Sequence, residues 1–370
     1  MDFIPVNQPL LDGNEKKYLA ECIDTGWISS EGPFIARLEK EMAARVGRKH
    51  GIAVCNGTAA LEAALVALDL PPGAEVIMPT FTIISCASAI IRAGLKPVAI
   101  DCDEKTWNMD PDLVKLKINK RTKAIMVVHI YGLPVDMDPI LELARVFGLK
   151  VIEDAAEAHG QTYRGRPCGG FGDISIFSFY PNKHVTTGEG GMIMTNDDAL
   201  AEQCRSLRNL CFGRKRFVHE KLGWNYRMSN LQAAVGCAQL ERLDESIKIK
   251  RNMGQKYTEL LSSVTGIGLP LHRTGYAENI YWVYGVVLDD ERPFDAEEMM
   301  KRLADRKVGA RPFFWPMHEQ PVFVSMGLFK GERCPKAERI ARRGLYLPSG
   351  LALTGPQIEQ VVQNVKEVLA

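Results

Sequence analysis

The sequence predicts an α/β fold, with a mainly parallel β-sheet flanked by helices in a large domain and a smaller α+β domain behind it. Short apolar runs alternate with helical periods from Gly51 onward, an order that is typical of βαβ units. The chain has 370 residues, which is long enough for two domains, and its 46% hydrophobic and 25% charged content is ordinary for a soluble globular protein. We expect the large domain over residues 1–245 and the small C-terminal domain over residues 246–370.

Composition excludes several classes of protein. The net charge of +1 gives no global reason to expect nucleic acid or an anionic membrane surface as a partner. The N-terminal MDFIPVNQP lacks the pattern of a signal peptide, and the longest uncharged apolar run, residues 83–91, is too short to span a bilayer. Nine cysteines without a CxxC pair predict reduced thiols and a cytoplasmic location, and seven histidines without HxxxH spacing predict no metal site.

The first fifty residues predict an extended start and two amphipathic helices, over residues 14–25 and 33–46. The loop between them, GWISSEGPF, contains Trp27 and Ser29. A loop of this kind either contacts a substrate or only connects two helices, and its residues leave both interpretations open.

Five strand-like runs follow, with helical segments near residues 58–69, 82–93, 110–118 and 137–147 between them. The runs are GIAV, EVIMP, KPVAI, KAIMVVHIY and KVIED. Ligands of parallel sheets bind at the carboxyl ends of the strands, so the residues directly after each run are candidates for a site.

The first of these candidates is CNGTAALEAAL, which starts at Cys55. Its Asn-Gly-Thr turn, with Gly57 and Thr58, precedes a strongly helix-forming segment. Free backbone N–H groups and the positive end of the helix dipole would suit a phosphate there, although the same turn is also an ordinary helix start. The chain contains neither GxGxxG after a strand nor GxxxxGK[ST], so the fingerprints of dinucleotide and P-loop sites are absent.

The second candidate is VIEDAAEAHG, in which Asp154 closes an apolar strand. A carboxylate at a strand end commonly caps a helix or meets solvent. It can also receive a proton from a ring nitrogen and keep that nitrogen positive, which is the partner that pyridoxal phosphate needs.

The third candidate is FSFYPNKHVTTGEGG, which places Lys183 between an apolar run and a cluster of Thr and Gly. This setting suits a lysine that enters a pocket as a nucleophile and forms a Schiff base, and it also suits a loop lysine after a buried strand. The phosphate turn at Gly57, the carboxylate of Asp154 and the amine of Lys183 form one constellation, which is far more specific than any one of them alone.

The rest of the chain adds elements with less specific chemistry. We expect a strand in GGMIMTNDD, a helix over 197–207, a long helix from Ser229, a strand in YWVYGVVL, a helix that opens at Asp295, and a C-terminal helix with Thr354 as its N-cap. The run Arg214, Lys215 and Arg216 is either a solvated loop or a cationic site for a pyrophosphate. His318, in a Pro- and aromatic-rich segment, is either a substrate ligand or a packed loop histidine.

Five motifs in this order resemble those of the sugar aminotransferases of the DegT/DnrJ/EryC1/StrS family: NGTAAL, EDAAEAHG, FSFYPNKHVTTGEGG, NYRMSNLQAA and RPFFWPMH. The resemblance covers nearly the whole chain. It implies the aspartate aminotransferase fold (fold type I) and a homodimer with shared active sites. It also implies pyridoxal 5′-phosphate as cofactor, which passes through its pyridoxamine form during the cycle.

The resemblance also implies roles for individual residues. Lys183 would bind the cofactor as a Schiff base and then move the proton, Asp154 would pair with the pyridine nitrogen, and the backbone at Gly57 and Thr58 would hold the phosphate together with Ser178. Asn225 would reach that phosphate from the other subunit. Two positions depart from the pattern of many relatives: Glu157 stands in place of a glutamine near the ring oxygen, and Ile83 in place of the stacking aromatic ring. The expected substrate-binding residues are Trp27, Ser29, Lys215, Arg227 and His318.

The reaction implied is transfer of an amino group from L-glutamate to C4 of a nucleotide-linked 4-keto-6-deoxy sugar. The expected substrate is GDP-4-keto-6-deoxy-mannose, giving GDP-perosamine for O-antigen and lipopolysaccharide synthesis, and the alternative is a UDP-4-keto-6-deoxy-N-acetylhexosamine. A dehydratase branch of the family has histidine at the position of Lys183, and a non-catalytic regulator would not need Lys183 and Asp154 together. The lysine therefore favours amino transfer over both.

Overall fold

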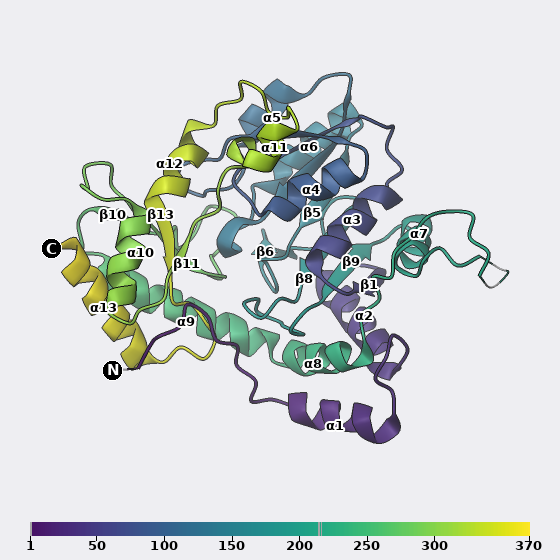
Figure 1. Ribbon diagram of the computed structural model, residues 1–370, viewed down its shortest axis with the longest axis horizontal. Helices are drawn as coiled ribbons and strands as arrows, with labels where there is room; N and C mark the ends of the chain where they lie inside the picture. The colour runs from purple at the N-terminus through teal and green to yellow at the C-terminus, as the bar shows by residue number, and fades with distance from the viewer. Residues whose placement is uncertain (1, 214, 216) are drawn as a thin grey trace.

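The computed structural model describes residues 2–213, 215 and 217–370, and its centre is a seven-stranded sheet (Figure 1). The strand order is β1-β9-β8-β5-β4-β2-β3. The strands are β1 (His50–Val54), β2 (Glu75–Pro79), β3 (Lys96–Ile100), β4 (Thr122–Val128), β5 (Lys150–Asp154), β8 (Ile174–Ser178) and β9 (Gly191–Thr195). All are parallel except β9, which is antiparallel to both of its neighbours, β1 and β8. The predicted α/β fold class with a mainly parallel sheet is confirmed.

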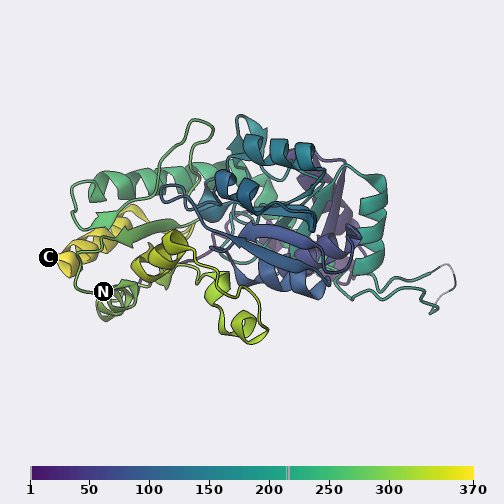
Figure 2. The same cartoon turned by 90° about the horizontal axis from the view of Figure 1, so that it is seen from above.

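Helices cover both faces of this sheet, as Figure 2 shows from above. One face packs against α3 (Gly57–Ala67), α4 (Ile84–Arg92) and α7 (Asp198–Arg208). The other packs against α2 (Pro33–Val46), α5 (Pro111–Lys117), α6 (Met137–Phe147) and α8 (Asn230–Glu241). Burial on both faces explains why strands such as EVIMP are apolar throughout and do not alternate.

A second, four-stranded antiparallel sheet lies toward the C-terminus, in the order β10-β11-β13-β12. Its strands are β10 (Ile267–Gly268), β11 (Tyr284–Leu288), β12 (Arg311–Pro312) and β13 (Gly344–Leu347), and its helices are α10 (Ala296–Asp305), α12 (Pro335–Arg343) and α13 (Gly355–Leu369). The remaining elements are α1 (Glu15–Thr25), α9 (Leu243–Leu261), α11 (Pro321–Ser325), η1 (Ile130–Gly132), η2 (Met317–Glu319) and the hairpin of β6 (Thr162–Tyr163) with β7 (Arg166–Pro167). The expected smaller α+β part is therefore present.

The boundary expected at residue 245 falls inside α9 and stays a prediction. The start of the chain packs with the second sheet. Ile4 forms a parallel bridge with Val308, and both residues belong to the hydrophobic core that includes this sheet. None of the helices in the described part of the chain combines the length and the apolar character needed to cross a membrane.

Two predicted strands are shorter than expected, and both differences shape the site. The run KAIMVVHIY leaves the sheet at Val128, because Ile130 N–H donates to Asn108 Oδ1 and Tyr131 N–H donates to Glu157 Oε2 in place of a neighbouring strand. Tyr131 has a φ of 56°, in the left-handed region. In YWVYGVVL, β11 begins only at Tyr284, so the preceding residues are free to turn toward the first sheet.

The three helices predicted to start at Ser229, Asp295 and Thr354 begin where they were expected, and each is capped. Ser229 and Thr354 each form a capping box at the start of α8 and α13, and the Asp295 side chain accepts the Glu298 N–H at the start of α10. The long helix expected from Ser229 is divided at Arg242 into α8 and α9.

Candidate active site

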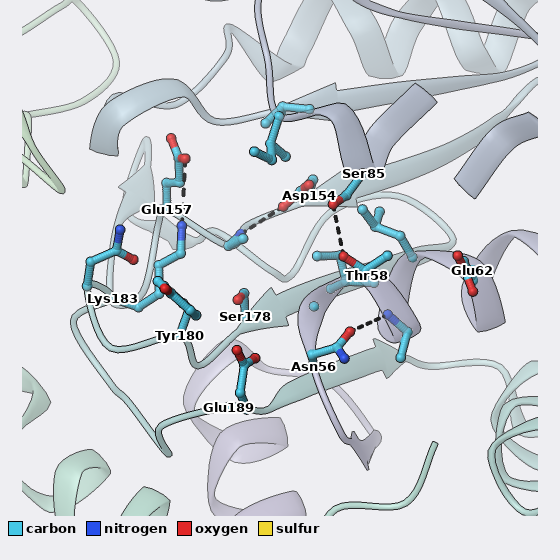
Figure 3. A pocket seen from close by; sticks show the side chains of 18 of the residues that line it. Asn56, Thr58, Glu62, Ser85, Asp154, Glu157, Ser178, Tyr180, Lys183 and Glu189 are labelled. Atoms are coloured by element: carbon cyan, nitrogen blue, oxygen red, sulfur yellow. Dashed lines mark hydrogen bonds and ion pairs between the residues drawn. The ribbon is translucent and has the colours of Figure 1, made fainter. Parts of the chain in front are cut away.

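A cavity of about 620 Å³ opens at the carboxyl ends of β5 and β8, beside the first turns of α3 and α4 (Figure 3). It brings together residues that are far apart in the sequence. The predicted residues that line it are Gly57, Thr58, Ile83, Asp154, Glu157, Ser178 and Lys183. The position agrees with the rule that ligands of parallel sheets bind at the carboxyl ends of the strands.

One side of the cavity is built to hold an anion. The helix α3 begins at Gly57, and Asn56 Oδ1 caps it by accepting the Ala59 N–H at 2.8 Å. The N–H groups of Gly57 and Thr58 belong to the first turn, so no helix carbonyl pairs with them, and the helix dipole makes this end positive. A Cβ on Gly57 would stand 2.7 Å from the Cβ of Ser178, so only glycine allows the turn and the strand end to approach this closely.

Hydroxyl groups complete the same side. Thr58 Oγ1 and Ser85 Oγ are 2.9 Å apart, and Ser178 lines the cavity beside them. Backbone N–H groups with three hydroxyls are a donor set that fits the phosphate of pyridoxal phosphate. Ser85, in the first turn of α4, was not predicted, although it lies only two residues after Ile83 in the sequence.

Asp154, at the end of β5, lines the cavity and is buried. Its Oδ1 accepts the Ala156 N–H at 3.0 Å, and its Oδ2 accepts from the Cys86 thiol at 3.4 Å. Burial raises the pKa of Asp154 because the carboxylate is removed from water. A protonated ring nitrogen would supply a donor and a positive charge to this buried group, so Asp154 fits the cofactor's pyridine nitrogen.

Lys183 enters the cavity from a turn after β8, in which its own N–H donates to the Tyr180 carbonyl. Its Nζ lies 3.7 Å from Glu157 Oε1 and 3.7 Å from the centroid of the Trp282 ring. Burial lowers the pKa of Lys183, against the opposing effect of Glu157. The side chain is therefore closer than a surface lysine to the neutral amine that a nucleophile requires.

Glu157 and Ile83 form the rest of the predicted group. Glu157 is buried, its Oε2 accepts the Tyr131 N–H at 2.8 Å, and burial raises its pKa to about 7. Ile83 precedes α4, and its side chain is 43% exposed along the cavity. The aliphatic side chain thus stands where a flat ring could pack on it.

The cavity does not include the predicted substrate residues or Asn225. The carbonyls of Trp27 and Ser29 hold Asn230 at the start of α8, and the Trp27 side chain is 49% exposed. Arg227 Nε donates to Asn225 Oδ1 at 2.9 Å. Their expected roles, one of which needs a second subunit, stay predictions.

Lys215 is exposed in the loop between α7 and α8, which projects from the body of the molecule (Figure 1). Its predicted neighbours in a cationic site, Arg214 and Arg216, lie outside the described residues. The interpretation of this run as a pyrophosphate site stays a prediction.

His318 is buried away from the cavity, between two other side chains. Its Nδ1 is 2.7 Å from Thr80 Oγ1, and its Nε2 is 3.1 Å from Glu338 Oε1. With both ring nitrogens engaged, the structure favours the packed loop histidine over the substrate ligand.

Trp282 is the main cavity residue that sequence reasoning missed. Its ring faces Lys183, its Nε1–H donates to the Asn182 carbonyl at 2.8 Å, and its backbone N–H donates to the Tyr131 carbonyl. The indole therefore fixes the turn that carries the lysine. No local signal marks this role, because YWVYGVVL has the pattern of a buried strand.

Comparison with known proteins gives one consistent result. The family model described as the DegT/DnrJ/EryC1/StrS aminotransferase family matches residues 9–366. The chain is 43% identical over 367 residues to the GDP-perosamine synthase of Caulobacter vibrioides, covering 99% of this chain and 98% of that protein. It is 40% identical over 365 residues to the GDP-perosamine synthase of Vibrio cholerae, covering 98% of each. The solved structure of the aminotransferase TlmJ from Streptoalloteichus hindustanus matches with a TM-score of 0.91 and 32% identity, covering 99% of this chain and 98% of that one.

Proposed function

We propose a substrate and a mechanism on the premise that this chain belongs to the DegT/DnrJ/EryC1/StrS aminotransferase family and is a pyridoxal phosphate-dependent nucleotide-sugar aminotransferase. It transfers the amino group of L-glutamate to C4 of GDP-4-keto-6-deoxy-mannose and so makes GDP-perosamine. Support for this sugar comes from the two relatives named GDP-perosamine synthase, which align over nearly the whole chain. The product would then serve O-antigen or other surface polysaccharide synthesis in the cytoplasm.

The observation that carries the proposed mechanism is the meeting of Lys183, Asp154 and the α3 turn in one cavity. Bound pyridoxal phosphate supplies an aldehyde that condenses with amines and a ring that withdraws electrons from the neighbouring carbon. The first turn of α3 and the hydroxyls of Thr58, Ser85 and Ser178 hold the phosphate and fix the ring's position. Asp154 holds a proton on the ring nitrogen, which keeps the ring positive.

Lys183 performs the two proton transfers of the reaction. Its Nζ would be the amine that holds the cofactor's aldehyde when no substrate is bound. The free amine would move a proton from Cα of glutamate to the cofactor in the first half of the reaction, and from the cofactor to C4 of the sugar in the second half. A histidine at this position could not bind the aldehyde, so the lysine favours amino transfer over dehydration.

The proposal includes a homodimer with shared active sites. Asn225 does not line the cavity of its own chain, and we expect it to reach the cofactor phosphate of a second copy. We expect no nucleic acid or membrane partner. The substrate residues Trp27, Ser29, Lys215 and Arg227 would contact the nucleotide sugar in the assembled dimer.

A glutamate-dependent assay over GDP-, UDP- and dTDP-linked 4-keto sugars tests the choice of substrate. Mass spectrometry of the amino sugar and the release of 2-oxoglutarate are measured together, with Lys183→Ala as the inactive control. We expect the highest kcat/KM with GDP-4-keto-6-deoxy-mannose. Turnover of UDP-linked sugars alone would instead support the UDP-4-keto-6-deoxy-N-acetylhexosamine alternative.

A further inference from the structure

We propose that Glu157 is the proton-exchange partner of Lys183: its carboxylate accepts the proton that Nζ must lose before the lysine can act as a nucleophile. The inference rests on the role of Lys183 in the proposed function and adds a second group that acts on the same reacting atom.

The geometry directs one oxygen of Glu157 at the lysine. Oε2 accepts the Tyr131 N–H at 2.8 Å, which fixes the carboxylate to the backbone of η1. Oε1 is left facing Nζ at 3.7 Å, and the dashed line in Figure 3 joins these two groups. The flexible four-carbon stem of the lysine allows the closer approach that proton transfer needs.

Burial brings the pKa values of Glu157 and Lys183 closer to each other. The Glu157 side chain is 5% exposed and the Lys183 side chain 10% exposed. Burial raises the pKa of Glu157 to about 7 and lowers that of Lys183. Proton exchange is most efficient between groups whose pKa values are close to each other and to the working pH.

The other ionisable groups around Glu157 leave it as the natural partner of the lysine. Asp154 is the nearest other carboxylate, but its two oxygens are engaged by the Ala156 N–H and the Cys86 thiol. Tyr131 is buried and Tyr346 partly buried, and burial raises the pKa of each phenol, so both stay neutral in the working range. Trp282, on another side of Nζ, offers only its ring face.

The step conserves charge and needs no other reactant. The ammonium of Lys183 and the carboxylate of Glu157 become a neutral amine and a neutral carboxylic acid, with one proton moved from Nζ to Oε1. Burial favours this neutral pair over two isolated charges because a low-dielectric site penalises ions. The reverse transfer restores the ammonium and the carboxylate.

Glu157→Gln removes the acceptor and keeps the size of the side chain and a carbonyl oxygen for the Tyr131 N–H. In cofactor-free protein, acetic anhydride labelling of Lys183 is measured against pH by mass spectrometry, with the exposed Lys120 as reference in the same digest. Without the neighbouring anion, the midpoint for Lys183 should move to lower pH by about one unit or more. Glu157→Asp keeps a carboxylate, so its midpoint should stay nearer to the wild-type value.

The loaded enzyme provides the second readout. The wild-type pH–rate profile should contain an ionisation near pH 7. This ionisation should be lost in Glu157→Gln.

Glu62→Gln is the matched control for labelling. Glu62 is also buried at the cavity, but it pairs with Arg92 and Tyr226 and lies across the cavity from Lys183 in Figure 3. An unchanged Lys183 midpoint in Glu157→Gln, or an equal shift in Glu62→Gln, overturns the proposal. Since labelling uses neither cofactor nor sugar, this failure is distinct from failure of the proposed function, which would appear as no attachment of the cofactor to Lys183.

Discussion

The indole ring of Trp282 covers the side-chain nitrogen of Lys183, with Nζ 3.7 Å from the ring centroid. The same indole donates its Nε1–H to the carbonyl of Asn182, the residue before the lysine. One side chain from the C-terminal third of the chain therefore holds both the reactive group and the turn that presents it. An ammonium over an aromatic face is stabilised electrostatically, and a hydrogen bond fixes the ring in place.

Replacing Trp282 should separate these two contributions. Trp282→Phe keeps a ring but loses the bond to Asn182, so the free energy of unfolding should fall by about 1 kcal/mol, whereas Trp282→Ala should cost about 3–5 kcal/mol. Urea unfolding of the cofactor-free proteins provides the measurement. Equal losses of unfolding free energy in the two variants would mean that the aromatic ring itself contributes nothing to stability.

Ile83 offers a gain-of-affinity test of the cofactor's position. The side chain lines the cavity at the start of α4 and is partly exposed. Ile83→Phe should add aromatic stacking worth about 0.5–1.5 kcal/mol and so lower the dissociation constant for pyridoxal phosphate by up to about tenfold. Fluorescence titration of the cofactor-free protein measures it, with Ile83→Leu as the aliphatic control. Weaker binding of pyridoxal phosphate to the phenylalanine variant would mean that the cofactor ring does not pack on residue 83.

The parts of the site that could be predicted from the sequence are those carried by the ends of the parallel strands. Gly57, Asp154, Ser178 and Lys183 follow or close apolar runs, and the topology of a parallel sheet brings such ends to one edge. The strands of the first sheet and the helices that cover it were also predictable, because the hydrophobic residues of each element are regularly spaced and a clear turn follows it.

The remaining parts depend on contacts between segments that are distant in the sequence. Tyr131 leaves the strand because Glu157, from the next strand's end, accepts its N–H. Trp282 reaches Lys183 only because β11 starts three residues later than the apolar run suggests. His318 had two interpretations that only its neighbours, Thr80 and Glu338, could distinguish.

Lys250 makes the stability of the fold depend on pH in a predictable direction. It is buried in α9, where Nζ donates to the carbonyls of Trp282 and Ser349, and burial lowers its pKa to about 7. The unfolded chain binds this proton more tightly, so the free energy of unfolding should rise as the pH increases from about 7 to about 10. The neutral amine still carries two N–H groups, enough for both carbonyls.

Lys250→Met should remove this part of the pH dependence while leaving other titrations in place. Urea unfolding at pH 7 and pH 9 measures the difference, and the methionine variant should show the smaller rise. Equal increases in the free energy of unfolding of the two proteins between pH 7 and pH 9 would contradict this account of Lys250.

His318→Gln should affect stability far more than substrate binding. Its ring joins Thr80, at the end of β2, to Glu338 in α12. Loss of these buried bonds should cost about 1–3 kcal/mol of unfolding free energy, with KM for the nucleotide sugar little changed. A large rise in KM at unchanged stability would restore the interpretation of His318 as a substrate ligand.

The identity of the lysine that binds the cofactor tests the central claim most directly. Borohydride reduction of the loaded enzyme, followed by digestion and mass spectrometry, locates any covalently fixed pyridoxyl group. We predict loss of the visible absorbance band on reduction and a pyridoxyl group on the peptide that contains Lys183, with none in Lys183→Ala. A pyridoxyl group on another lysine, such as the buried Lys250, or no attached group at all, would contradict the account.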